Sequence, residues 1–259
     1  MQRVPAMSKL PRIVLALVIG VTLLAPVTLR GQHEEFGYSG AHGPAQWAHT
    51  SGWEACAVTS KRQSPIAIDH VTVDRALTPL QMTAHPTPLA LVNNGHTVEQ
   101  EYEPGAAITV GGARYDLAQF HFHAPSEHTI NGHHAALELH AVFAEPNSSR
   151  KAVVAQLFTV GKSNPFLAEL LDGSLPAKSG DHTGNARPIN VADAFTDLGH
   201  YYTYDGSLTT PPCSETVTWF VLQRTGELSS AQAAAFERVL GKNARPLQSR
   251  NERVVRGTP

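Results

Sequence analysis

The sequence predicts a mainly β domain of the α+β class, built on one large sheet with a few short helices at its periphery. Three observations support this fold class. Seven short segments alternate apolar and polar residues or are continuously apolar, which is typical of strands. Turn signals such as Asn94-Gly95 and Asn131-Gly132 separate these segments. Only two segments carry helix boundaries, so the pattern does not fit a βαβ array.

The predicted strands are short and lie between positions 90 and 223. They are, in chain order, Ala90–Asn93, Thr97–Glu101, Ala107–Val110, Leu117–His123, Ala135–Phe143, Ala152–Val160 and Thr216–Gln223. The chain before them is rich in Gly and Pro from about position 32 onwards and predicts loops.

Two segments carry the signals that begin and end helices. In the first, Asn164 is a suitable N-cap, Pro165 fits the first helical position, and Gly173 follows the end. The second begins at Ser229, and Gln232 three residues later completes a capping box. Both helices are short, so we expect them to cover the sheet rather than to form a core of their own.

The N-terminus has the pattern of a secretory signal. Arg3, Lys9 and Arg12 are positive, and the apolar run Ile13–Leu24 follows them. We therefore predict a signal peptide over about residues 1–31, with an uncertain cleavage site, and an exported protein without stable membrane association after cleavage. An uncleaved membrane anchor is the alternative, although the run is short for a spanning helix.

The charge balance excludes one class of partner. The chain has 20 Lys and Arg residues against 22 Asp and Glu residues. A near-neutral chain has no electrostatic basis for binding nucleic acid or another polyanion.

The chain has two cysteines, Cys56 and Cys213. An even number of cysteines in an exported protein favours a disulfide. Two buried free thiols are the alternative.

The most informative stretch is His121-Phe122-His123, because residues two apart on a strand point to the same face. His140 lies on a second predicted strand, where it shares a face with Glu138. If these strands are neighbours, three imidazoles converge. Three neutral nitrogen ligands and one open position describe a catalytic zinc site.

Two polar residues strengthen this interpretation. Gln119 shares the face of the first two histidines, and Glu138 shares the face of the third. Histidines that bind metals donate their second N–H to an amide, carboxylate or carbonyl oxygen, and these two residues suit that role. A simply exposed polar face is the alternative. It is disfavoured because the opposite face is apolar and the ligand face also carries the apolar Val142, so both faces are expected to be at least partly buried.

The segment from Gln119 to His128 resembles the signature of the α-class carbonic anhydrases. Further segments match this family in the same order: Gln63-Ser64-Pro65-Ile66, Asn93-Asn94-Gly95-His96, Glu138-Leu139-His140 and Ser207-Leu208-Thr209-Thr210-Pro211-Pro212-Cys213. The match runs from about Tyr38 to about Val254. The resemblance implies a single catalytic domain over residues 32–259, with a large central, mixed, mostly antiparallel twisted sheet.

The resemblance also implies the activity: zinc-dependent, reversible hydration of carbon dioxide to bicarbonate and a proton. It makes His121, His123 and His140 the ligands of Zn²⁺. Thr209 matches the hydroxyl that accepts a hydrogen bond from zinc-bound hydroxide, and Glu127 matches the carboxylate that accepts the threonine proton. The cysteine pair resembles that of bacterial and extracellular members, which implies a periplasmic or secreted enzyme.

The remaining matched positions surround this centre. His96 corresponds to the proton shuttle, and Asn243 to the residue whose backbone carbonyl accepts a hydrogen bond from a zinc ligand. The residues matching the substrate pocket are Val142, Val153, Leu208, Thr209, Thr210, Val217 and Trp219, and those matching the water network are Tyr38 and Asn94. Taken singly, each has an ordinary alternative: Glu127 could be a surface acid, and His96 merely an exposed turn residue.

Two other functions compete with this one. A zinc hydrolase of esters or peptides would usually carry a carboxylate beside the metal, as in His-Glu-x-x-His, and the sequence has no such motif. Incidental esterase activity remains compatible with the site. A non-catalytic binding module would be expected to lack a zinc histidine, and all three are present. The sequence leaves the oligomeric state open, with a homodimer as one alternative.

Overall fold

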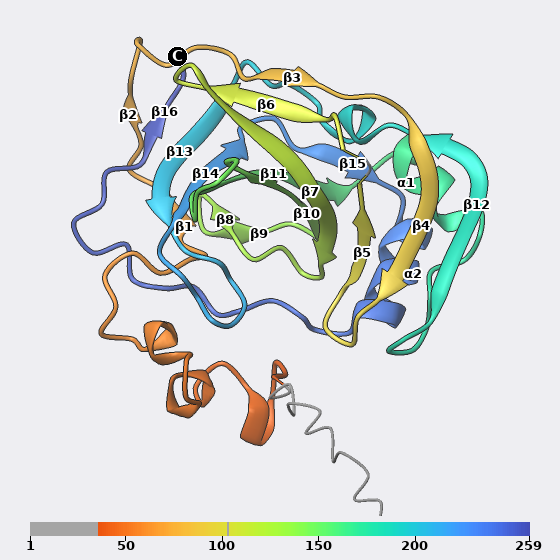
Figure 1. Cartoon of the computed structure of the whole chain (residues 1–259), viewed down its shortest axis with the longest axis horizontal. Helices are drawn as coiled ribbons and strands as arrows, with labels where there is room; N and C mark the ends of the chain where they lie inside the picture. The colour runs from red at the N-terminus through yellow and green to blue at the C-terminus, as the bar shows by residue number, and fades with distance from the viewer. Residues whose placement is uncertain (1–35, 103) are drawn as a thin grey trace, which may run out of the picture. The chain divides into compact units, whose positions relative to one another are not determined.

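A computed structural model describes residues 36–102 and 104–259 (Figure 1). The predicted signal peptide over residues 1–31 lies outside these ranges. Within them, no helix has both the length and the apolar character needed to cross a membrane.

The structure is dominated by one large mixed sheet, as predicted. Thirteen strands of the described residues belong to it. Its main path, from right to left in Figure 1, is β12 (His182–Ile189), β4 (Thr87–Asn93), β5 (Val98–Glu101), β7 (Ala113–His123), β10 (Leu137–Ala144), β11 (Lys151–Val160), β14 (Val217–Leu222), β13 (Tyr201–Gly206), β16 (Arg256–Gly257) and β2 (Thr72–Val73). Most neighbours are antiparallel, whereas β11 with β14 and β16 with β2 are parallel.

Short elements complete the sheet and its surroundings. Off the main path, β3 (Gln81–Thr83) pairs with β6 (Ala107–Val110), and β15 (Gly226–Leu228) pairs with β11. A second, three-stranded sheet contains β1 (Ala67–Ile68), β8 (Thr129–Ile130) and β9 (His133–His134). In the part of the chain that the structure describes, four 3-10 helices lie at Gly40–His42, Trp47–His49, Glu54–Cys56 and Val191–Ala194.

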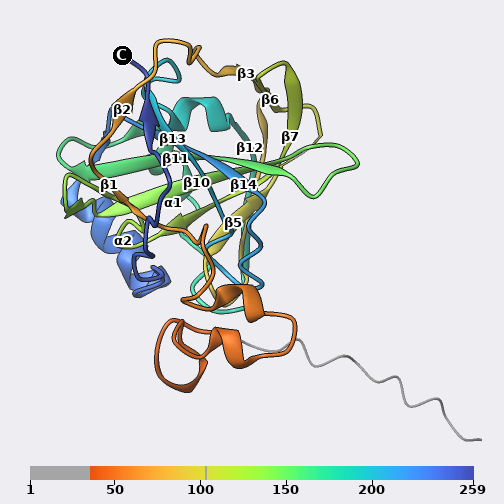
Figure 2. The ribbon, with the colours of Figure 1, turned by 90° about the vertical axis from the view of Figure 1, so that its left-hand side faces the viewer.

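The two α-helices begin where the sequence predicts. In α1 (Pro165–Leu171) the Asn164 side chain accepts a hydrogen bond from the backbone N–H of Leu167, and in α2 (Ser230–Leu240) Ser229 and Gln232 form the predicted capping box. Gln232 also bonds to both backbone groups of Asn164, so one residue joins the starts of the two helices. The two helices lie close together beside the sheet (Figures 1 and 2).

Both faces of the central strands are buried, which positions the site. On one face, Phe120, Phe122, Leu137, Leu139 and Phe143 join a large apolar core that includes residues of α1 and α2. Burying each such side chain stabilises the fold by roughly 1.5–3 kcal/mol relative to leaving it exposed. On the other face, a smaller apolar cluster lies beside the histidines and is formed by Ile66, Ile68, Ala135, Val142, Val153, Ala155, Leu157, Tyr204, Val217, Trp219, Val221 and Val255.

The predicted strands are all present, and the missed ones have identifiable causes. Strand β6 has the predicted bounds, and the other six differ by a few residues at their ends. The sequence did not predict β12, because Gly184 and Pro188 interrupt it. The structure places β12 at an edge, where it pairs with β4 alone and its register shifts before Pro188. Proline is tolerated at such an edge because its missing N–H faces no second partner.

Candidate functional site

Three histidines meet on the face of the sheet opposite the large core. His121 and His123 end β7, and His140 pairs directly with His121 from the neighbouring strand β10. Their ring centroids lie 4.6–5.2 Å apart. One nitrogen from each ring lies within 4.8 Å of the others, so the group could hold a metal ion. The arrangement follows from strand alternation and from the register of these two strands.

The two histidines of β7 are oriented by oxygen acceptors. The Nδ1–H of His121 donates to Gln119 Oε1 at 2.7 Å, and the Nδ1–H of His123 donates to the backbone carbonyl of Asn243 at 2.8 Å. Both of these oxygens accept hydrogen bonds and cannot donate one. The proton of each ring therefore lies on Nδ1, and the lone pair remains on Nε2. That nitrogen is therefore available to bind a metal.

His140 is oriented by a buried carboxylate. Its Nε2–H donates to Glu138 Oε1 at 2.9 Å, which leaves Nδ1 for a metal. The same carboxylate accepts from the ring and the backbone N–H of His128, at 2.7 and 2.9 Å. Burial alone would raise the pKa of Glu138, but the His128 and His140 imidazoles outweigh it and hold that pKa well below its usual value. Glu138 is therefore the ionised acceptor that a metal-binding imidazole needs.

Burial keeps the histidines of β7 neutral. It lowers the pKa of His121 well below its usual value, and the neighbouring imidazoles of His123 and His140 lower it further. The pKa of His123 is also lowered, chiefly by burial. Metal binding requires the neutral ring, so the protein holds these side chains in the state that binds.

Three buried polar atoms around the cluster have no hydrogen-bond partner among the described residues: His123 Nε2, Glu127 Oε2 and the Tyr38 hydroxyl. His123 Nε2 lies 3.6 Å from Glu127 Oε2. The other oxygen of Glu127 accepts from the backbone N–H of Arg245 at 2.8 Å. Buried polar atoms are rarely left unpaired, so this set fits a missing cation and its ligand. The residues present thus suit a metal ion on geometry and on donor chemistry.

The histidines lie where a polar and an apolar cavity meet. The polar cavity, of about 160 Å³, is lined by Phe36, Tyr38, Asn94, His96, Thr97, Glu99, Gln119, His121, His123 and Thr210. The apolar cavity, of about 280 Å³, is lined by Ala118, Gln119, His121, His140, Val142, Lys151, Val153, Leu208, Thr209, Thr210 and Trp219. Because Gln119, His121 and Thr210 belong to both, the cavities adjoin at the cluster.

The residues expected to form a substrate pocket lie together, with one difference in depth. The apolar cavity contains Val142, Val153, Leu208 and Trp219. Val217 does not line it but packs behind it in the same apolar cluster, with 2% of its surface exposed. The Trp219 indole is fixed by a hydrogen bond from its N–H to the Ser207 carbonyl at 3.0 Å.

His96 lies in the polar cavity, outside the cluster, and is partly exposed. Its ring stacks on Phe36, with centroids 3.6 Å apart and an interplanar angle of 12°. Its backbone N–H donates to the Asn94 side chain, and its carbonyl accepts from the Asn243 side chain. The imidazole therefore lies between the buried cluster and solvent.

Thr209 lies beside the cluster, in the loop between β13 and β14, and is 5% exposed. Among the hydrogen bonds of the described residues, none joins Thr209 to Glu127, although the resemblance implies one. Glu127 Oε2 is the oxygen that remains open to it.

Cys56 and Cys213 form the predicted disulfide, with their Cα atoms 5.1 Å apart. It joins the N-terminal loops to the loop that carries Thr209. Gln63 donates to the Cys213 carbonyl at 3.1 Å, and Arg245 donates to the Cys56 carbonyl at 3.2 Å. Both carbonyls beside the disulfide are therefore held by buried side chains.

Sequence reasoning missed three buried residues around the site. His128 lies in the quoted signature, and its Nε2 shares a 2.7 Å hydrogen bond with the Tyr204 hydroxyl. Arg245 is 3% exposed and lies over the Trp47 ring. Burial lowers the pKa of Arg245 to about 10, and the charge of Glu127 opposes that shift. The pair of Glu138 with a second histidine in the signature could have suggested His128, whereas no local pattern marks Arg245 or Tyr204.

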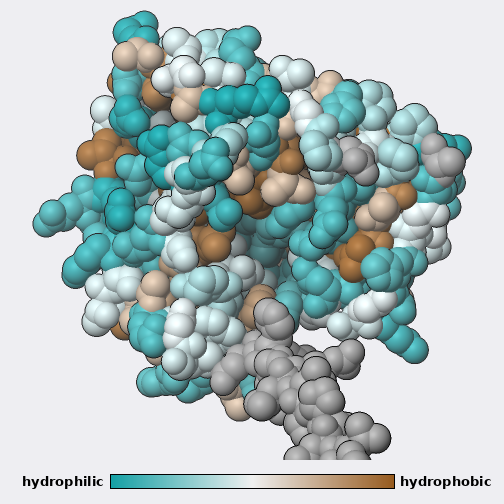
Figure 3. Space-filling view, in the orientation of Figure 1, coloured by the Kyte–Doolittle hydropathy of each residue, from teal (hydrophilic) through white to brown (hydrophobic). Residues whose placement is uncertain are grey.

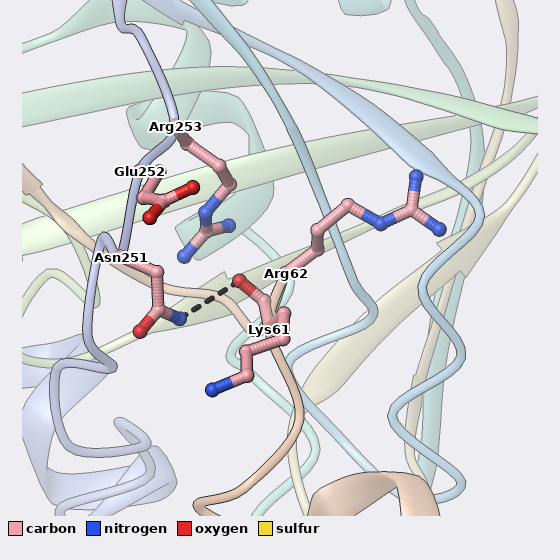
Figure 4. Close-up of a pocket in the computed structure, with 5 residues that line it drawn as sticks. All are labelled: Lys61, Arg62, Asn251, Glu252 and Arg253. Atoms are coloured by element: carbon pink, nitrogen blue, oxygen red, sulfur yellow. Dashed lines mark hydrogen bonds between the residues drawn. The ribbon is translucent and has the colours of Figure 1, made fainter.

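A separate cavity of about 510 Å³ is lined by Lys61, Arg62, Asn251, Glu252 and Arg253 (Figure 4). The Asn251 amide donates to the Lys61 carbonyl across it. The Arg253 guanidinium donates to the backbone carbonyls of Arg250, Asp205, Gln63 and Ser249, so little of its hydrogen-bonding capacity remains for an anion. On the face drawn in Figure 3, the coloured residues are largely hydrophilic and the hydrophobic ones form separate patches. These features give no second candidate site.

Comparisons with known proteins agree on one family. A sequence model described as eukaryotic-type carbonic anhydrase matches residues 42–258. The carbonic anhydrase of Neisseria gonorrhoeae is 36% identical over 248 residues, which cover 95% of this chain and 96% of the relative. The solved structure of Photobacterium profundum alpha-carbonic anhydrase is 40% identical with a TM-score of 0.80, covering 86% of this chain and 100% of that one. The alpha-carbonic anhydrase of Thermovibrio ammonificans, solved in complex with the inhibitor sulfanilamide, is 38% identical with a TM-score of 0.81, covering 86% and 98%.

Proposed function

The chain belongs to the eukaryotic-type (α) carbonic anhydrase family, and from that premise we propose that it hydrates carbon dioxide reversibly at a zinc ion held by three histidines. Membership makes it a lyase, a carbonate dehydratase, with carbon dioxide and bicarbonate as its small-molecule substrate and product.

We assign the metal to His121 Nε2, His123 Nε2 and His140 Nδ1. These are the nitrogens left free once the other ring N–H groups donate to Gln119, Asn243 and Glu138. Three neutral nitrogen donors suit zinc and leave a fourth position open. Zinc so bound acidifies a water ligand, to a pKa of about 7 in the carbonic anhydrases where this is established, and thereby supplies a nucleophile at neutral pH.

The apolar cavity holds carbon dioxide beside this centre. Val142, Val153 and Trp219 are nearly fully buried and offer the substrate no hydrogen bond except through the distant indole N–H, which Ser207 already occupies. An apolar wall favours the uncharged substrate over the bicarbonate anion, because burying an unpaired charge costs free energy. It also keeps bulk water from competing.

Thr209 and Glu127 select what sits at the open position. Glu127 Oε2 is buried and lacks a donor, so it can accept a hydrogen bond from the Thr209 hydroxyl. The threonine oxygen can then act only as a hydrogen-bond acceptor, and it favours a ligand that is a hydrogen-bond donor. This pair orients the attacking oxygen toward the apolar cavity.

His96 carries the proton to solvent. Histidine is the side chain best suited to exchange protons in the physiological pH range, which fits this role. Tyr38 and Asn94 line the polar cavity with His96 and would order the intervening water.

Two further properties follow from the family and from the predicted export. We propose that sulfanilamide inhibits this chain as it does the Thermovibrio ammonificans relative, and that the same centre has incidental esterase activity. The disulfide fits an exported protein. We propose cleavage after about residue 31 and a periplasmic or secreted location.

The observation that carries the proposal is the set of three converging imidazoles whose outer N–H groups all donate to oxygen acceptors. Stopped-flow carbon dioxide hydration tests it, with purified protein before and after zinc removal and after zinc is restored. Hydration that is lost with zinc and returns with it is the expected result. A protein that hydrates carbon dioxide equally well without zinc, or not at all when loaded, would refute the proposal.

A further inference from the structure

Lys151 is the only lysine among the described residues that line the apolar cavity. It begins β11 and shares a strand face with Val153, because the two are separated by two positions. Val153 belongs to the wall beside the histidines. Lys151 therefore continues that wall away from the histidines, and its side chain is partly buried. A lysine in such a place can lay its alkyl stem on apolar surface and keep its ammonium in water.

The strand register gives the separation from the metal ligands. Lys151 pairs with Ala144 on β10, four residues beyond His140. At about 3.3 Å per residue, the two backbones are roughly 13 Å apart along the strand. A lysine side chain spans about half of that distance. The ammonium can thus face a ligand that occupies the cavity without reaching the metal itself.

The charges around Lys151 leave its ammonium uncompensated. Among the described residues, no hydrogen bond or ion pair involves this side chain. Asp116 on β7 pairs with Ala144, as Lys151 does from the other side, but its carboxylate is bound to Arg114 at 2.6 Å. Glu145, next along the chain from β10, is held by Arg150. Both carboxylates therefore already have cationic partners, whereas Lys151 has none among the described residues.

We infer that Lys151 is a specificity-determining residue, which makes the outer end of the apolar cavity a recognition point for anions. It acts on bicarbonate as this anion moves to and from the centre. It also favours elongated ligands that bind the metal at one end and carry a carboxylate at the other. The inference rests on the proposed zinc function and deepens it.

Two para-substituted benzenesulfonamides test this role. Sulfanilamide is uncharged at its outer end, whereas 4-sulfamoylbenzoate carries a carboxylate there. Dissociation constants are measured calorimetrically with the zinc-loaded protein at low and high salt. The variants are Lys151→Met, which keeps the stem and removes the charge, and Lys151→Arg, which keeps the charge. Lys162→Met is the matched control, since Lys162 is exposed beyond the opposite end of β11 and lines neither cavity at the histidine cluster.

For Lys151→Met, we expect affinity for 4-sulfamoylbenzoate to fall about two- to fivefold more than affinity for sulfanilamide, the size of a partly exposed ion pair. The difference shrinks at high salt and is absent in Lys151→Arg and Lys162→Met. Competition of bicarbonate with sulfanilamide weakens in parallel.

Equal losses for both sulfonamides, or no loss, would overturn the role of Lys151 and leave the zinc site standing. Failure of both probes to bind the zinc-loaded wild-type protein would overturn the proposed centre and this inference with it. The two failures are therefore distinguishable.

Discussion

His123 Nε2 lies 3.6 Å from Glu127 Oε2, and neither atom has a hydrogen-bond partner among the described residues. Both side chains are buried, so neither atom can form a hydrogen bond with water in place of the one it lacks within the protein. Leaving buried polar groups unpaired costs about 1–3 kcal/mol each. The free energy that a cation and its ligand would recover here is one reason to expect strong coupling between metal and stability.

Zinc should therefore stabilise the folded protein. Binding to the folded state alone adds stability that rises with zinc concentration, about 4 kcal/mol at a thousandfold excess over the dissociation constant. For a chain of this size, we expect a rise of about 5–15 °C in the thermal midpoint, measured by calorimetry with and without chelator. The variant His123→Ala should show little of this rise. An unchanged wild-type midpoint would contradict a buried zinc site.

Glu138→Gln should weaken zinc binding without removing a ligand. The carboxylate accepts from His140 and from His128, and a neutral amide makes a poorer acceptor for both. Loss of such an outer partner typically costs 10–100-fold in metal affinity, which competition with a chromophoric chelator measures. Glu145→Gln is the control, because Glu145 pairs with Arg150 away from the cluster. Equal affinities in the two variants would show that Glu138 does not tune the site.

Glu215 should contribute to stability above acidic pH. Burial raises its pKa, but hydrogen bonds from the Gln63 side chain and the Arg62 backbone lower it below its usual value overall. A depressed pKa in the folded state adds stability that is present above the unfolded value, near 4.3, and is lost as pH falls through the folded value.

Urea unfolding of Glu215→Gln tests this from pH 7 to pH 2. The variant should be less stable by about 0.5–1 kcal/mol at pH 7, a modest figure because solvent screens this partly exposed group. The difference should shrink below pH 4.3 and vanish near pH 2. A difference that grows as the pH falls would have the wrong sign.

The sequence could predict the histidine cluster because strand alternation is a local property. Parity alone placed His121 and His123 on one face, and a hydrogen bond between Gln119 and His121 needs only two positions on that strand. The helix starts were equally local, since Asn164 and Ser229 cap the backbone within three residues. Such features survive without knowledge of the tertiary structure.

The contacts that complete the site were not local. Arg245 meets Glu127 across 118 positions, and Tyr204 meets His128 across 76. No pattern along the chain encodes such pairs, because they depend on how distant strands and loops pack. The strands β13 and β16 were missed for a related reason. Their pairing with each other and with β14 and β2 makes them strands, rather than a strong pattern of their own.

Reducing the disulfide should destabilise the fold. The Cys56–Cys213 disulfide closes a loop of 157 positions. Losing a native disulfide typically lowers the free energy of unfolding by about 2–5 kcal/mol. Urea unfolding with and without a reductant should show this loss in the wild-type protein. The double variant Cys56→Ser, Cys213→Ser should unfold at the same urea concentration as the reduced wild-type protein, and adding the reductant should not change its midpoint. Equal unfolding midpoints for oxidised and reduced wild-type protein would contradict the prediction.

His96→Ala should slow turnover mainly where buffer is scarce. The imidazole lies in the polar cavity, stacked on Phe36 and partly exposed, so its loss removes a proton carrier without touching a metal ligand. In dilute buffer, we expect about a tenfold or greater fall in kcat, less than the roughly hundredfold or more that positioned acid–base groups typically contribute, because water and residual buffer still carry protons. Added imidazole should restore much of that rate, because the external base can enter the cavity that the side chain vacates.

His133→Ala is the control, since His133 is exposed on β9 and lines neither cavity at the histidine cluster. A loss for His96→Ala that is equal at every buffer concentration would place the defect in binding or in the metal centre, because proton export limits the rate only when no other carrier is available.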